Sequence, residues 1–184
     1  MINSNNLYSP AFEHDNCGVG FIARIDGNPA HSIIESSIRI LENLEHRGAV
    51  GSDQATGDGA GLLMRIPDFF MHRECADLGL RLPEFGDYGV AMLFLPADKK
   101  SAAICTKIVE KIVTGEQCEI IGWRDVPLNP GGIGELARET QPGVRQLILS
   151  RGAWAAEDFE RKLYVIRRMI ENEILAYEGR DLSQ

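Results

Sequence analysis

Cys17 is the side chain whose type and setting best suit nucleophilic chemistry. It stands between a polar leader, residues 1–16, and a run of small and apolar residues, 18–22. A cysteine thiolate attacks acyl carbon well, but a free cysteine has a pKa of about 8.5 and needs a base to react near neutral pH. The sequence offers Cys17 no obvious histidine partner.

The base could instead come from Cys17 itself. Cleavage after Asn16 would make Cys17 the first residue, with a free α-amino group whose pKa is about 7.7–8.0. Such an amine can accept the thiol proton and return it to a leaving group. The leader is rich in Asn and Ser and contains Pro10, a composition typical of an exposed, irregular segment, which a processing site requires.

Residues 18–25 are predicted to form a strand that begins beside this cysteine. Gly18 and Gly20 would let a substrate approach the backbone. The apolar side chains of this strand are expected to lie in a core: Val19, Phe21 and Ile22. From the residues alone two alternatives stay open, because Cys17 could be a small buried residue and the leader an ordinary terminus that is never cut.

Five motifs, in the same order along the chain, resemble the class II glutamine amidotransferase domain of glutamate synthase large subunits. They are HDNCGVGFI at 14–22, LEHRGA at 44–49, TGDGAG at 56–61, GWRDVP at 122–127 and FERKLYVIR at 159–167. The resemblance implies an α+β fold, the four-layer αββα sandwich of N-terminal nucleophile hydrolases. It also implies that residues 1–16 are a propeptide ending at Asn16. Residues 17–184 would be the N-terminal portion of the domain, incomplete at its C-terminal end.

The resemblance further implies a reaction. Cys17 would attack the side-chain amide of L-glutamine, ammonia would leave, and water would hydrolyse the thioester to glutamate. In glutamate synthases the ammonia is then delivered to 2-oxoglutarate, with FMN and iron–sulfur chemistry in other parts of the synthase. We therefore expect no cofactor and no metal in this chain, and other glutamate synthase domains or subunits as partners.

Arg47 matches the family's arginine close to the nucleophile, which implies a supporting role in the site. Apolar spacing predicts a helix over 32–48, with Ser32 and Glu35 in the form of a capping box. Arg47 would then stand at the helix C-terminus, where a cation also stabilises the helix dipole. Both roles stay open.

Two pieces of the family's site have no counterpart in this sequence: a substrate-binding arginine in a Ser-Arg-Thr stretch, and an Asn-Gly pair that forms the oxyanion hole. The similar stretch 150–152 precedes the last predicted helix, so the family positions are expected beyond Gln184. One oxyanion donor is typically worth about 10²–10³ in kcat. We therefore expect little glutaminase activity from this chain without a partner. The alternative is a truncated, non-catalytic interaction or regulatory module that retains the fold.

Turn residues and periodicity predict helices and strands in mixed order. Helices are expected at 32–48, 67–79, 99–113, 135–140 and 159–179, and strands at 18–25, 62–66, 88–95, 118–123 and 144–150. The spacing lacks tight βαβ units and is compatible with antiparallel sheet covered by helices.

Composition narrows the function classes. The 184 residues suit one domain, and a net charge of −8 provides no basic surface for nucleic acid. No apolar run approaches the ~20 residues that span a bilayer, and the leader lacks the apolar middle of a signal peptide. We expect a cytoplasmic protein without a membrane partner. Cys75, Cys105 and Cys118 lack metal-site spacing and are expected to be reduced packing residues.

Overall fold

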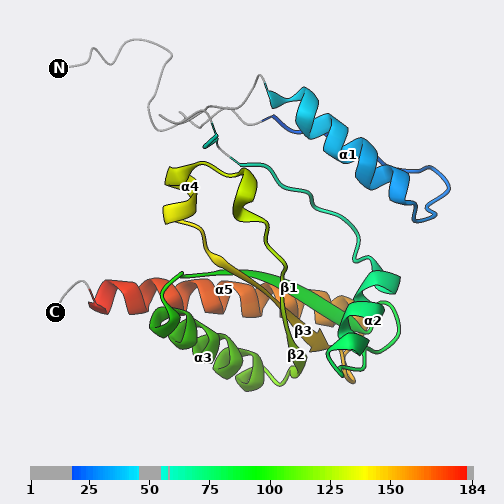
Figure 1. Ribbon diagram of the computed structural model, residues 1–184. Coiled ribbons are helices and arrows are strands. Elements are labelled where there is room, and N and C mark those ends of the chain that lie inside the picture. Colours follow the sequence, from blue (N-terminus) through cyan, green and yellow to red (C-terminus); the bar gives the residue numbers. More distant parts are fainter. Residues whose placement is uncertain (1–17, 46–54, 58, 182–184) are drawn as a thin grey trace, which may run out of the picture. The chain divides into compact units, whose positions relative to one another are not determined.

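The computed structural model describes residues 18–45, 55–57 and 59–181, with the side chains of the last helix described up to residue 177 (Figure 1). The chain divides into two compact units. Unit 1 comprises Met1–Leu63 with Gly132–Ala137, and unit 2 comprises Met64–Gly131 with Arg138–Gln184.

Unit 2 is built on a three-stranded antiparallel sheet with the order β1-β3-β2. Its strands are β1 (Tyr88–Leu95), β2 (Glu119–Asp125) and β3 (Gly143–Ser150). The central strand β3 pairs with β1 from Tyr88 opposite Ser150 to Leu95 opposite Gly143, and its pairing with β2 is irregular between Ile120 and Gly122. Because β3 is the central strand and helices pack on both faces of the sheet, its apolar run 147–149 is buried on both faces.

Helices cover both faces of this sheet. Successive side chains of a strand point to opposite faces. Leu147 and Leu149 therefore pack with α3 (Lys99–Gly115) and α5 (Ala156–Asp181). Ile148 packs on the other face against α2 (Asp68–Asp77). Figure 1 shows α3 and α5 running side by side along the sheet, and the two helices contact each other.

The sequence pattern explains why these helices form where they do. Apolar side chains recur every three to four residues along α5 and face the core: Phe159 and Ile166 are buried, and Leu163 and Ile170 pack against the same cluster. Helix α3 begins at a true cap, because the Asp98 side chain accepts a hydrogen bond of 2.8 Å from the backbone N–H of Ser101. The predictions for the three strands and three helices of unit 2 are confirmed to within a few residues.

Unit 1 contains helix α1 (His31–Asn43), which follows a turn at residues 24–27. In that turn Gly27 has a φ of +68°, and its N–H donates to the Arg24 carbonyl. Two short elements overlap residues 132–137, the second sequence segment of unit 1. They are the 3-10 helix η3 (Pro130–Gly132) and helix α4 (Glu135–Glu139), which was predicted. None of the residues in α1 is buried.

Two strand predictions in unit 1 and at its edge are wrong. No strand is formed over 18–25 or 62–66 in the described structure. Phe21 is 94% exposed and Leu63 is 103% exposed, so these apolar side chains lie in no core. A strand needs a neighbour to take its backbone hydrogen bonds. The described residues give neither segment such a neighbour.

The prediction for the helix over 32–48 is correct in place but wrong at both ends. Ala30 is the N-cap and makes no side-chain hydrogen bond, so Ser32 lies inside the helix and forms no capping box. The helix ends at Asn43, short of Arg47.

At the level of fold class, the mixture of helices with a small antiparallel sheet agrees with the predicted α+β class. Among the described residues, no helix is both long and apolar enough to cross a bilayer. The same part of the chain holds no group of three or more His, Cys, Asp or Glu side chains placed to bind a metal ion.

Candidate active site

The predicted catalytic residues Cys17 and Arg47, and the predicted cleavage position after Asn16, lie outside the described residues. Their neighbours Gly18 and Leu44 lie inside them. The geometry of the candidate site is therefore built from the segments that flank its two functional residues.

The segment that follows Cys17 lies against the C-terminal half of α1. A Cβ atom placed on Gly18 would come within 3.2 Å of Leu44 Cδ2, and one placed on Gly20 would come within 2.5 Å of Ile40 Cγ2. The second distance is shorter than real Cβ contacts allow. A side chain at position 20 would therefore force Ile40 or the segment itself to move.

This packing changes the role expected for these glycines. Sequence analysis assigned Gly18 and Gly20 to substrate approach, whereas the structure gives them to contact with α1. Neither has a positive φ, so steric room rather than an unusual backbone conformation explains the residue type. On alternate positions, Val19 and Phe21 are 89% and 94% exposed. The segment therefore presents one side to α1 and leaves an apolar side open.

The TGDGAG motif is joined to the glycine-rich connection of unit 1. The Gly134 N–H donates to the Ala55 carbonyl at 3.0 Å, and the Ala137 N–H donates to Thr56 Oγ1 at 3.4 Å. Gly59 has a φ of +81°, which favours glycine at that position. Sequence analysis did not connect residues 134–137 with this motif, and no signal in their composition indicates a contact so distant along the chain.

The other cysteines differ from a reactive nucleophile. Cys75, on α2, is buried against the sheet, Cys118 is buried in the cluster formed by α3, α5 and the sheet, and Cys105 is half-buried. Burial raises the pKa of the Cys75 and Cys118 thiols above the ordinary value. Because the thiolate is the reactive species, these two side chains are suited to packing, as predicted.

Arg151, in the stretch similar to the family's substrate-binding motif, is engaged within unit 2. Its Nε donates to Asp87 Oδ1 at 3.0 Å, and its Nη1 donates to the Trp154 carbonyl at 2.6 Å. These contacts give the side chain a structural role after β3.

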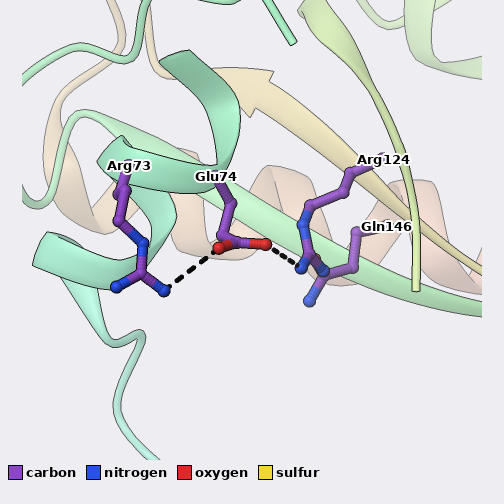
Figure 2. A network of polar contacts seen from close by, with 4 residues as sticks. All are labelled: Arg73, Glu74, Arg124 and Gln146. Carbon is purple, nitrogen blue, oxygen red and sulfur yellow. Dashed lines mark hydrogen bonds and ion pairs between the residues drawn. The ribbon is translucent and has the colours of Figure 1, made fainter. Parts of the chain in front are cut away.

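Arg124 of the GWRDVP motif forms the most buried polar network of unit 2 (Figure 2). Its side chain is only 7% exposed and donates to Glu74 Oε2 at 2.5 Å and to Gln146 Oε1 at 3.1 Å. Glu74 also accepts from Arg73 at 3.1 Å. The hydrogen bond from Arg124, followed by that from Arg73, lowers the pKa of the Glu74 carboxyl.

This network joins α2 to β2 and β3. The GWRDVP motif contributed to the family resemblance, but the sequence predicted no contact for Arg124. The available signal was a charged residue inside a strand pattern, because a buried charge needs a partner. Nothing in the pattern identified Glu74, fifty residues earlier, as that partner.

Comparison with known proteins gives one family and a consistent set of relatives. The model of "Glutamine amidotransferases class-II" matches residues 17–182. The glutamate synthase [NADPH] large chain of Bacillus subtilis (strain 168) is 41% identical over 174 residues, which cover 94% of this chain and 11% of that protein. That of Azospirillum brasilense is 42% identical over 171 residues, with 92% and 11% covered.

A third relative extends this similarity to a eukaryote. The glutamate synthase [NADH] of Saccharomyces cerevisiae is 38% identical over 173 residues, covering 88% of this chain and 8% of that protein. The chain thus spans about a tenth of the length of these relatives. A family match that begins at Cys17 and runs into the last helix shows that the chain belongs to the class-II glutamine amidotransferases.

Proposed function

We propose that this chain is the glutaminase component of a glutamate synthase, with Cys17 as its nucleophile. The observation that carries the proposal is the family match, which starts at Cys17 and covers residues 17–182. Relatives named as glutamate synthases align along nearly the whole chain. The proposal includes removal of residues 1–16, which precede the match.

The chemistry follows from an N-terminal cysteine. The α-amino group takes the thiol proton, and the thiolate sulfur adds to the amide carbon of L-glutamine. The amine then protonates the departing nitrogen, so ammonia leaves and a thioester remains. Water adds to the thioester, and glutamate is released with the thiol restored. The ammonia is the product that the rest of a synthase would transfer to 2-oxoglutarate.

The packing of unit 1 supports a role for Arg47 beside Cys17. Gly18 lies against Leu44, Cys17 is one residue from Gly18, and Arg47 is three residues from Leu44. A chain spans at most about 3.3–3.6 Å per residue. Arg47 can therefore reach the neighbourhood of the nucleophile, where a guanidinium would favour the thiolate.

The exposed apolar side chains of unit 1 support the finer fold proposal. Phe21 and Leu63 belong to extended segments whose apolar sides face no core. Exposed apolar surface in a soluble protein indicates a contact surface. We propose that these segments contact the rest of the αββα sandwich of N-terminal nucleophile hydrolases through their exposed apolar side chains.

The proposal extends to the surroundings of the chain. Its substrate would be L-glutamine, and its partners would be other glutamate synthase domains or subunits that carry FMN and iron–sulfur centres. No cofactor is assigned to this chain, and a cytoplasmic location is proposed with it.

The test measures glutamate release from L-glutamine. The chain is co-expressed with the region that follows the aligned part of the Bacillus subtilis large chain, and intact mass reports whether residues 1–16 are lost. We expect processing and turnover, with Cys17→Ser removing turnover while circular dichroism stays unchanged. Turnover that survives Cys17→Ser would disprove the proposed nucleophile. A processed complex without turnover would favour the non-catalytic module.

Arg47→Ala tests the supporting role, with Arg39→Ala as the matched control on α1. Arg39 is an exposed arginine on α1. An electrophilic glutamine analogue should label Cys17 more slowly in Arg47→Ala and at the normal rate in Arg39→Ala. Equal rates in both variants would leave Arg47 with no part in activating the thiol.

A further inference from the structure

Helix α5 carries a second line of side chains, away from the core. Tyr164, Arg168, Glu171 and Leu175 are spaced by four, three and four residues. At about 3.6 residues per turn, this spacing places all four within about 60° of one another around the helix. The buried residues Phe159 and Ile166 lie on the other side. We call these four residues the α5 line.

The two ends of the α5 line are apolar and exposed. Tyr164 is 64% exposed and Leu175 is 65% exposed, in a helix that already buries its core stripe. Val165 and Met169, which lie between the α5 line and the buried residues around the helix, are partly exposed as well. A helix that is apolar on more than its core-facing side is typical of one that contacts a partner there.

The two inner positions carry opposite charges. Arg168 and Glu171 form an ion pair within the helix, and Arg167 Nε donates to the second oxygen of Glu171 at 2.8 Å. These arginines lower the pKa of the Glu171 carboxyl, which is therefore charged near neutral pH. The order along the line is apolar, positive, negative, apolar.

This order is complementary to itself when the helix is reversed. If a second α5 runs antiparallel, with the two-fold axis between residues 169 and 170, Tyr164 of each copy faces Leu175 of the other. The same operation places Arg168 of each copy opposite Glu171 of the other. The same four residues of each copy thus make two apolar contacts and two ion pairs with the other copy. Use of the same surface by both copies defines an isologous interface.

We infer that α5 binds the α5 helix of a second copy of this chain, antiparallel, through the α5 line. The line is about 16 Å long from Tyr164 to Leu175, at about 1.5 Å per residue. A single line of side chains along three helical turns is a small contact, and small interfaces are typical of weak, transient complexes. The dimer therefore forms reversibly and depends on concentration. It does not require the proposed glutaminase activity.

Sedimentation velocity over a wide range of concentrations tests the inference. The wild-type chain should shift from monomer to dimer as concentration rises. Arg168→Glu and Glu171→Arg should each stay monomeric, because like charges would then face each other twice across the axis. The first variant carries two acidic side chains on the line and the second carries two basic ones.

Mixing the two variants separates the intermolecular contact from the pair within one helix. In the mixture each acidic line can face a basic line, so a heterodimer should form, although neither helix regains the ion pair between positions 168 and 171 of one chain. Restored dimerisation on mixing therefore reports contact between copies. A mixture that stays monomeric would overturn the inference, as would a wild-type chain that is monomeric at every concentration.

Arg73→Glu is the matched control. It makes the same change at an exposed arginine on α2, across the sheet from α5. This variant should dimerise as the wild type does, with unchanged circular dichroism in all variants. If Arg73→Glu also abolishes the dimer, net charge rather than the α5 line controls association, and the inference fails.

Discussion

The two units differ in where their apolar side chains lie. Every buried hydrophobic residue in the described part of the chain belongs to unit 2, whereas α1 of unit 1 buries none of its residues. The segments that flank Cys17 and Arg47 nevertheless belong to unit 1. The stable part of this chain and the part that carries the candidate chemistry are thus different regions. The proposed function therefore depends on contacts beyond those that stabilise the sheet.

The two units also differ in the secondary structure they form, because helices and strands take their backbone hydrogen bonds from different parts of the chain. Helix α1 forms because its hydrogen bonds are local, so a helix can be present before its apolar face is covered. The extended segments 18–25 and 62–66 have strong strand composition but lack a neighbour for their backbone groups. In unit 2 the same kind of composition gives three paired strands, because each has a neighbour.

The largest expected effect on stability is in the core of unit 2. Ile148 is fully buried between α2 and the sheet, so Ile148→Ala should lower the free energy of unfolding of unit 2 by about 2–5 kcal/mol. Ile38→Ala, at an exposed position of α1, should change it by less than about 0.5 kcal/mol. Urea denaturation followed by circular dichroism measures both. Equal losses of unfolding free energy in Ile148→Ala and Ile38→Ala would show that the two units share one core.

A smaller loss is expected from the Arg124 network. Arg124→Ala leaves Glu74 without its closest partner and Gln146 without a donor, and should cost about 1–3 kcal/mol. Arg73→Ala removes the exposed partner of the same carboxylate and should cost at most about 1 kcal/mol. The urea midpoints of the two variants are compared with that of the wild type. A larger loss of stability in Arg73→Ala than in Arg124→Ala would show that the exposed ion pair contributes more to stability than the buried one.

In unit 1 the expected effect is local. Gly20→Ala places a methyl group where Ile40 Cγ2 lies, so the segment next to Cys17 must move away from α1. Labelling of Cys17 in the processed protein should slow, while the urea midpoint of unit 2 stays unchanged. Ile40→Ala removes the obstructing atom and should restore labelling in the double variant.

Gly61→Ala is the control for the glycine substitution. A Cβ at Gly61 meets nothing within 4 Å, so labelling should keep its normal rate. If Gly20→Ala labels as fast as Gly61→Ala, the contact between this segment and α1 does not position the nucleophile.

The sequence predicted elements better than it predicted contacts. The strand predicted over 144–150 and the helix predicted over 159–179 are confirmed, with Leu147, Ile148 and Leu149 buried in β3 and Phe159 and Ile166 buried in α5. Residue patterns do not report which distant side chain meets Arg124 or Gly20. Those contacts depend on tertiary packing between segments twenty or more residues apart.

The candidate site shows the same limit. Motif resemblance predicted the family and identified Cys17, and the family match confirms the family. The roles of Cys17 and Arg47 stay predictions. The reason for glycine at 18 and 20 became visible only when α1 was in place, because steric room is a property of the packed structure.

The smallest effect concerns acid stability and compares one carboxylate from each unit. Arg124, then Arg73, lower the pKa of Glu74 in the folded state below its ordinary value of 4.5. Arg24 lowers the pKa of Asp26 in unit 1 to about 2, from 3.8. A depressed carboxyl pKa stabilises the folded state fully above the unfolded pKa. That stabilisation is lost as pH falls through the folded pKa.

Unit 2 should therefore lose stability below about pH 4.5 partly because Glu74 takes up a proton. In Glu74→Gln this contribution is absent, so the urea midpoint should fall less steeply with decreasing pH than in the wild type. Asp26→Asn should leave the pH profile of unit 2 unchanged, because Asp26 and Arg24 are exposed partners in unit 1. Parallel profiles for wild type and Glu74→Gln would remove Glu74 from the acid response. A flatter profile in Asp26→Asn would show that unit 1 unfolds together with unit 2, against the separation proposed here.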